Sequence, residues 1–188
     1  MSEQELTALA FAAGRGDRDA VTALIQATQR DLLRFLGAQA APGDVEDLAQ
    51  ETYLRALRAL PQFAGHSSVR TWLFSIARRV AVDQVRRAVR QPRLTAAADW
   101  QSAADAADAV SGPRFDEQHA LTELLAGLLP ERRAAFVATQ IAGLSYAEAA
   151  EVCGCPVGTI RSRVARARDD LIAAMREPTA GTAGAAAS

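Results

Sequence analysis

Apolar residues recur along this chain at the spacing of helices, and the pattern contains no strand-like alternation. Glycine, proline and aspartate interrupt it at residues 14–17 and 42–43, and a loop is expected at 61–67. Asp44 and Ser68 stand where they can cap the helices that follow these breaks. The pattern therefore predicts an all-α protein whose first unit has helices at 3–13, 18–38, 45–60 and 68–89.

A second helical unit is expected over residues 117–176, and its end has the layout of a helix-turn-helix. Ser145, with Glu148 three residues later, predicts a capping box at the start of a short helix. Gly154 suits the C-terminal cap of that helix, and Pro156 suits the first position of the next one. This motif presents its second helix to the major groove of DNA.

The second helix of the motif divides into two faces at about 100° per residue. Its apolar face is formed by Val157, Ile160, Val164, Ala167 and Leu171. The opposite side carries Gly158, Ser162, Ala165 and Asp169, flanked by Arg161 on one edge and by Thr159 and Arg166 on the other. The residues expected to meet DNA, here called the groove face, are Gly158, Thr159, Arg161, Ser162, Ala165 and Arg166. Small residues at its centre allow close approach to DNA, and the arginines at its edges reach bases and phosphates. The alternative is an amphipathic surface helix with solvated arginines.

The helix at 45–60 carries a leucine in the middle of its polar side. This surface, the Leu54 face, consists of Asp47, Gln50, Glu51, Leu54 and Arg58. A leucine surrounded by polar groups is typical of a protein interface, with the leucine as anchor and the polar groups as rim. Single exposed leucines are also common on ordinary surfaces, and this remains the alternative.

The helix at 68–89 is expected to pack on two sides and to carry a basic stripe. Its predicted core face comprises Val69, Trp72, Leu73, Ile76, Ala77 and Val80. Val82, Val85 and Val89 lie roughly opposite, which predicts a second covered side. The stripe comprises Arg79, Arg86 and Arg90, with Asp83 beside it to orient the arginines. We interpret the stripe as a nucleic-acid surface and not merely a solvated one.

Charge is distributed unevenly, although the net charge of the 188 residues is only −1. Residues 70–93 hold seven arginines against one acid, and residues 161–168 hold four arginines and no acid. Residues 95–117 hold five acids against one arginine. The sequence therefore predicts a unit at 1–92, an acidic linker at 93–116, a second unit at 117–176 and a disordered tail at 177–188.

Several classes of function find no support in the sequence. There is no nucleophile–base motif, no glycine-rich phosphate loop and no metal-ligand cluster, so neither catalysis nor a cofactor nor a metal is expected. Cys153 and Cys155 have C-x-C spacing, which is not that of a zinc site. No stretch resembles a membrane span or a signal peptide, so a cytoplasmic protein without membrane contact is expected.

Four stretches, at 44–57, 68–87, 129–136 and 143–168, together resemble bacterial RNA polymerase sigma factors of the extracytoplasmic-function (ECF) group. The resemblance implies two small helical domains, sigma domains 2 and 4, joined by a flexible acidic linker. It implies that the Leu54 face binds the β′ clamp of core RNA polymerase, with a further contact to the β flap. It also implies that the groove face reads the −35 promoter element.

The resemblance further assigns the −10 promoter element to the first unit, where a single DNA strand is held with bases flipped into pockets. The residues implied, here called the −10 set, are Phe63, His66, Ser67, Ser68, Arg78, Arg79, Arg86 and Arg90. Arg79 stands where the family often has asparagine, so the base preference at −10 stays open. The family also implies a free monomer, and an anti-sigma protein as a regulator.

Two other classes of protein would also use a helix-turn-helix unit. A dimeric transcriptional regulator would bind a palindrome without core polymerase, and an inhibitor-like interaction protein would mimic one sigma domain. The second basic unit and the acidic linker argue against the regulator, and two intact DNA-facing helices argue against the inhibitor. Mass in solution and duplex binding without polymerase discriminate these classes.

Overall fold

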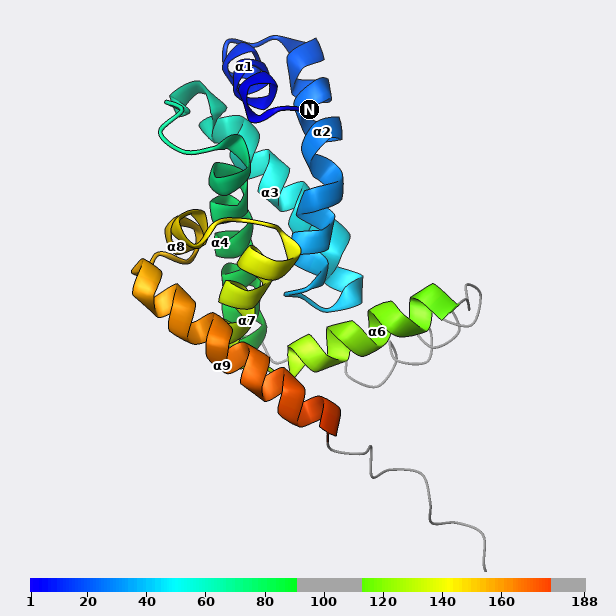
Figure 1. Ribbon diagram of the computed structural model, residues 1–188. Coiled ribbons are helices and arrows are strands. Elements are labelled where there is room, and N and C mark those ends of the chain that lie inside the picture. Colours follow the sequence, from blue (N-terminus) through cyan, green and yellow to red (C-terminus); the bar gives the residue numbers. More distant parts are fainter. Residues whose placement is uncertain (91–112, 177–188) are drawn as a thin grey trace, which may run out of the picture.

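The computed structural model describes residues 1–90 and 113–176, and these residues are helical with no strand among them, which confirms the predicted fold class (Figure 1). The N-terminal unit consists of α1 (Glu3–Gly14), α2 (Arg18–Gly37), α3 (Val45–Ala59) and α4 (Val69–Arg90). The C-terminal unit consists of α6 (Pro113–Ala126), α7 (Pro130–Phe136), a π-helical turn (Val137–Ile141), α8 (Tyr146–Cys153) and α9 (Val157–Arg176). Most of the predicted linker and the predicted tail lie outside the described residues.

Among the described helices, side-chain caps precede α1, α2, α4 and α8. Ser68 Oγ accepts from the Thr71 backbone N–H at 3.1 Å at the start of α4, as predicted. Asp44 precedes α3, but its side chain makes no capping hydrogen bond, so that prediction was wrong. The physical reason is its backbone, which is α-like at φ −99° and ψ −8° after a 3-10 turn, whereas capping residues are extended.

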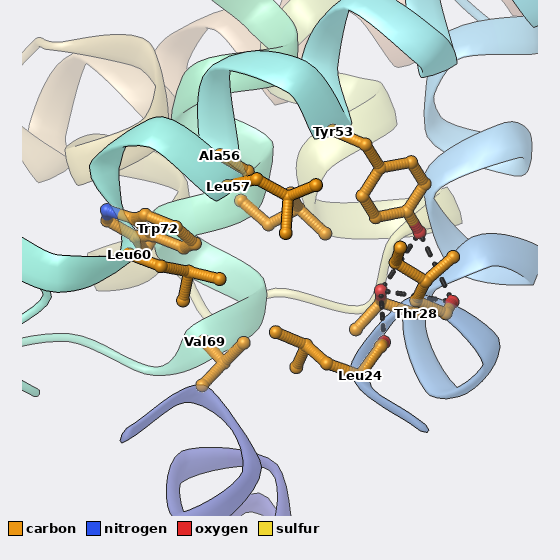
Figure 2. A pocket seen from close by; sticks show the side chains of 10 residues that line it. Leu24, Thr28, Tyr53, Ala56, Leu57, Leu60, Val69 and Trp72 are labelled. Atoms are coloured by element: carbon orange, nitrogen blue, oxygen red, sulfur yellow. Dashed lines mark hydrogen bonds between the residues drawn. The ribbon is translucent and has the colours of Figure 1, made fainter. Parts of the chain in front are cut away.

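One cluster of buried residues holds α1, α2 and the start of α4 together, and includes Leu6, Leu24 and Leu60. A small pocket lies beside it, between α2, α3 and α4, and no residue of its lining is charged (Figure 2). Across this pocket the Tyr53 hydroxyl reaches Thr28 Oγ1 at 2.9 Å, and Thr28 in turn donates to the Leu24 carbonyl. Burial raises the pKa of Tyr53. The hydrogen bonds satisfy the two hydroxyls, so the pocket is part of the core.

A second cluster of buried residues runs without interruption from the N-terminal unit into the C-terminal unit. It contains Phe35 and Phe74, whose rings stack at a centroid distance of 4.7 Å, together with Val137 and Ala149 of the C-terminal unit. The cluster is continuous because α8 packs on α4 and the π-helical turn packs on α2 (Figure 1). The two units therefore share one apolar core.

This packing corrects two expectations about α4. Phe74 is only 1 % exposed although it was left out of the predicted core face. A second side of α4 is covered, and α8 is the helix that covers it. Val85, which was expected to lie on that side, is 62 % exposed. A helix buried against partners in two directions has no single apolar stripe, which is why the periodicity misplaced these residues.

The helix-turn-helix has the predicted local geometry. Ser145 and Glu148 form the capping box of α8, and Gly154 ends that helix at φ +63°. Pro156 lies immediately before α9, where its carbonyl accepts from the Thr159 and Ile160 backbone N–H groups. It therefore occupies the N-cap position, one residue earlier than predicted.

Candidate functional site

The groove face of α9 is open to solvent. Gly158, Arg161, Ser162, Ala165 and Arg166 are exposed, and Thr159 is half-buried. The apolar side of the same helix is buried, with Ile160, Val164 and Ala167 at most 1 % exposed. The predicted division of α9 into a core side and an outer side is therefore confirmed.

The arginines of α9 fall into two groups with different surroundings. Arg163 donates to Cys155 Sγ at 3.5 Å, and Arg168 donates to Gln140 Oε1 at 2.9 Å, so both are engaged within the C-terminal unit. Arg161 and Arg166 make no ion pair with a described residue. A positive edge on each side of a small-residue surface is the arrangement that admits a DNA backbone.

The Leu54 face lies on the outer side of α3. Leu54 is 51 % exposed, Asp47, Gln50 and Arg58 are exposed, and Glu51 is half-buried. The exposed leucine thus stands among polar groups, as predicted from the sequence.

Glu51 of the Leu54 face takes part in an ion-pair network that links α3 to α4. Arg55 donates to Glu51 Oε1 at 2.7 Å and to Asp83 Oδ2 at 2.9 Å, which ties α3 to α4. The hydrogen bond from Arg55 lowers the pKa of Asp83, and the nearby Arg87 and Arg86 add to this effect. Asp83 was expected to orient the arginine stripe, but its hydrogen-bond partner is Arg55 of α3.

The −10 set does not form one exposed surface in this structure. His66, Arg79 and Arg86 are exposed and Ser67 is half-buried. The side chain of Arg90 lies outside the described residues. These positions extend from the loop before α4 along much of that helix.

Phe63, another member of the −10 set, is a core residue. It is 8 % exposed and lies between Phe11 and Trp72, at ring-centroid distances of 5.6 and 5.2 Å. The structure does not place its ring where DNA can reach it. Its burial arises because the loop before α4 folds back onto α1, and sequence spacing gives no sign of that contact.

Ser68 and Arg78 adjoin the C-terminal unit. Glu148 Oε1 lies 3.3 Å from both Ser68 Oγ and Thr71 Oγ1. Arg78 is half-buried, its Nε is buried without a hydrogen-bond partner among the described residues, and its charge acts on the Cys153 thiol. Two members of the −10 set are therefore drawn into the contact between the units. The sequence pattern predicts only the role of Glu148 in the capping box of its own helix, and no local pattern predicts its second contact.

The described residues contain no group of three or more side chains that could hold a metal ion. Cys153 is buried, and this burial raises the pKa of its thiol. No described helix combines the length and apolar character needed to cross a membrane.

Comparison with known families matches two models to this chain. The model described as Sigma-70 region 2 matches residues 24–91, and the model described as Sigma-70, region 4 matches residues 118–171. The first covers α3 and α4, and the second covers the helix-turn-helix.

Similar proteins match nearly the whole chain. The ECF RNA polymerase sigma factor SigC of Mycobacterium tuberculosis is 47 % identical over 171 residues, which is 91 % of each chain. The ECF RNA polymerase sigma-E factor of Escherichia coli is 32 % identical over 176 residues, covering 84 % of this chain and 87 % of the relative.

Solved structures with a similar fold include two complexes. CnrH, in complex with the cytosolic domain of CnrY, has a TM-score of 0.70 at 26 % identity, over 89 % of this chain and 94 % of that one. The sigma factor RpoE of Bartonella quintana, in complex with the anti-sigma factor NepR, has a TM-score of 0.61 at 26 % identity, over 83 % of this chain and 98 % of that one.

Proposed function

The chain belongs to the ECF sigma factors of bacterial RNA polymerase, and we propose that it binds core polymerase and directs it to promoters through −10 and −35 elements. Members of this family are initiation factors and not enzymes, so the polymerase supplies the chemistry. One observation carries the proposal: a single chain joins an open groove face on a helix-turn-helix to a second unit that exposes Leu54 within a polar face.

The groove face is the proposed reader of the −35 element. The side chains at its centre, those of Gly158, Ser162 and Ala165, are small enough for α9 to enter the major groove. Arg161 and Arg166 then lie at the two edges, where they meet base edges or phosphates. The buried side of α9 fixes the helix to α7, so the reading side chains start from a rigid support.

The Leu54 face is the proposed contact to the β′ clamp. Leu54 supplies an apolar anchor, and Asp47, Gln50 and Arg58 supply a polar rim that specifies orientation. The pairing of Arg55 with Glu51 and Asp83 stiffens this surface, because it fixes α3 against α4 before a partner arrives.

We assign the −10 element to α4 and the loop before it, with Phe63 removed from the contacting residues. His66, Arg79 and Arg86 are exposed in the structure, whereas Ser68 and Arg78 are half-buried beside the C-terminal unit. Phosphates of a single strand are the ligands that fit exposed arginines at this spacing.

Further partners follow from the family. An anti-sigma protein is a proposed regulator, supported by the similarity of this fold to RpoE in complex with the anti-sigma factor NepR. We propose a cytoplasmic location, because the polymerase that such a factor serves is cytoplasmic. We also propose a monomer in the free state.

The test is run-off transcription from a library of genomic fragments, using core RNA polymerase with and without the protein. New discrete transcripts with shared −10 and −35 elements are expected, and they define the promoter sequence. Binding to core polymerase without any new transcript would refute promoter-directed initiation. A protein that ignores core polymerase but binds a palindrome as a dimer would instead be a conventional regulator.

A further inference from the structure

Helix α1 lies before the stretch that the Sigma-70 region 2 model matches, which begins at residue 24. In Figure 1 it lies beside the loop that leads from α3 into α4. This loop, here called the −10 loop, spans residues 63–68 and carries His66 and Ser67 of the −10 set. None of its residues is helical, so its shape depends on what it packs against.

The start of the −10 loop is fixed by a close approach between two stretches of backbone. The 3-10 turn Leu60–Gln62 precedes the loop, and Gly14 at the end of α1 lies against this turn. A Cβ atom at Gly14 would stand 2.8 Å from the Leu60 carbonyl oxygen, which is too close for any side chain. Glycine therefore lets α1 and the turn approach this closely.

The middle of the −10 loop lies under an aromatic ring of α1. Phe11 packs on Phe63 at a ring-centroid distance of 5.6 Å. Gly65 has φ +71°, and a Cβ atom there would stand 3.2 Å from Cζ of Phe11. Phe11 is itself 39 % exposed, so its ring covers the loop from the outside. One side chain of α1 thus constrains two positions of the loop.

The end of the −10 loop is joined to α1 by a hydrogen bond. The backbone N–H of Val69, the first residue of α4, donates to Glu3 Oε1 at 2.7 Å. The first N–H groups of a helix have no partner within the helix, and a carboxylate suits the positive end of the helix dipole. Ser68 Oγ accepts from the Thr71 N–H, so the two caps satisfy different groups. Glu3 therefore caps α4 from 66 positions away.

The three contacts follow one another in opposite directions along the two segments. As the chain passes from Leu60 to Val69, its partners on α1 run from Gly14 through Phe11 to Glu3. A helix rises 1.5 Å per residue, so Glu3 and Gly14 lie roughly 16 Å apart along the axis of α1. Helix α1 therefore supports the −10 loop at its start, its middle and its end.

Capture of a flipped base requires a loop of defined shape. A binding site that is formed in only a fraction of the molecules has its apparent affinity reduced by that fraction. Phosphates held by the exposed arginines of α4 do not depend on the loop in this way, because those arginines project from a helix. Support of the loop should thus affect recognition of the −10 sequence more than binding of single strands in general.

We propose that α1 sets the conformation of the −10 loop, and that Glu3 and Phe11 are positioning residues for recognition of the −10 element. They act through Val69, Phe63 and Gly65 and need no contact with DNA. This role rests on the proposed function, because the loop is taken there to bind the single strand.

The experiment compares full-length variants bound to core polymerase, using two fluorescent single strands. One strand carries the −10 element defined by run-off transcription, and the other has an unrelated sequence. Glu3→Ala is the main variant, because it removes the acceptor for the Val69 N–H from an exposed position and leaves no cavity. Glu5→Ala is the matched control: Glu5 lies in the same turn and accepts from the Ser2 backbone N–H at 2.7 Å, so its loss weakens the start of α1 without touching the loop.

Glu3→Ala is expected to weaken binding of the −10 strand about fivefold, the effect of losing one typical hydrogen bond, and to leave binding of the unrelated strand unchanged. Glu3→Gln should keep most of the affinity, because its amide oxygen can still accept from the Val69 N–H. Phe11→Ala should show the same pattern as Glu3→Ala. Glu5→Ala should bind both strands as the wild type does.

Hydrogen–deuterium exchange of the free chain tests the support of the loop without DNA. The backbone amides of residues 63–69 should exchange faster in Glu3→Ala and Phe11→Ala than in the wild type, because a segment that loses its contacts opens more often. Exchange of the same residues in Glu5→Ala should match the wild type.

Three results would overturn the proposal. Equal strand binding by Glu3→Ala and Glu5→Ala would show that the contact with Val69 has no role of its own. Equal losses for the −10 strand and the unrelated strand would show that Glu3 does not act through the −10 loop. Unchanged exchange of residues 63–69 in Glu3→Ala and Phe11→Ala would show that α1 does not set the conformation of the loop. Failure of the proposed function is distinct, because the wild type would then hold both strands equally tightly.

Discussion

Replacement of Leu54 tests the proposed contact with core polymerase most directly. Fully burying a leucine side chain contributes about 1.5–3 kcal/mol, and Leu54 is still 51 % exposed in the free chain. About half of that free energy, on the order of 1 kcal/mol, is thus left for a partner to gain. Leu54→Ala should therefore weaken binding to core polymerase roughly fivefold.

Leu54→Asp should have a larger effect, because it places a carboxylate under the partner next to Asp47 and Glu51. A buried charge without a partner costs several kcal/mol, so the loss of affinity should be on the order of a hundredfold. The folded chain should tolerate the change to within about 0.5 kcal/mol, because the side chain is exposed before binding.

The assay is binding of each full-length variant to core polymerase on a biosensor surface, together with urea unfolding of the free chain. Val85→Asp is the matched control, since Val85 is 62 % exposed and lies outside the Leu54 face and the −10 set. Normal binding by Leu54→Asp, or equal weakening by Val85→Asp, would remove the assignment of the Leu54 face.

Three further predictions concern other parts of the site. Arg161→Ala should weaken −35 binding by about 1–3 kcal/mol for the preferred sequence if Arg161 reads a base, and a uniform loss over all sequences in a gel-shift series would make it a phosphate contact. Gly158→Ala should leave the free energy of unfolding in urea unchanged or raise it, but should weaken −35 binding. Gly154→Ala should lower the free energy of unfolding by about 1 kcal/mol, because Gly154 has φ +63°. Equal changes in unfolding free energy for the two variants would contradict the geometry. The pKa of Asp83 is lowered by its pairing with Arg55, so this pairing stabilises the fold at pH values above the ordinary pKa of 3.8 and is lost as the pH falls through the pKa of the folded state. The difference in free energy of unfolding between the wild type and Asp83→Asn should therefore shrink in acid. A difference that grows in acid would contradict the prediction.

Local rules account for the parts of this structure that the sequence predicts well. The capping box at Ser145 and the positive φ of Gly154 depend on neighbours within a few residues, so short patterns are enough to predict them. The groove face and the Leu54 face depend on one helical period, and in each case the opposite side of the helix is buried. The exposed arginines of α4 and α9 were predicted from runs of charge, which also lie within short stretches of sequence.

The errors arise where burial depends on residues distant in sequence. Phe74 is buried by Phe35 and by the C-terminal unit, and Phe63 by Phe11 and Trp72, and none of these contacts has a signature in a short window. Glu148 shows the same limit at a functional surface, because its contact with Thr71 spans 77 positions. A side chain with two oxygens can satisfy a local rule with one of them and a distant contact with the other.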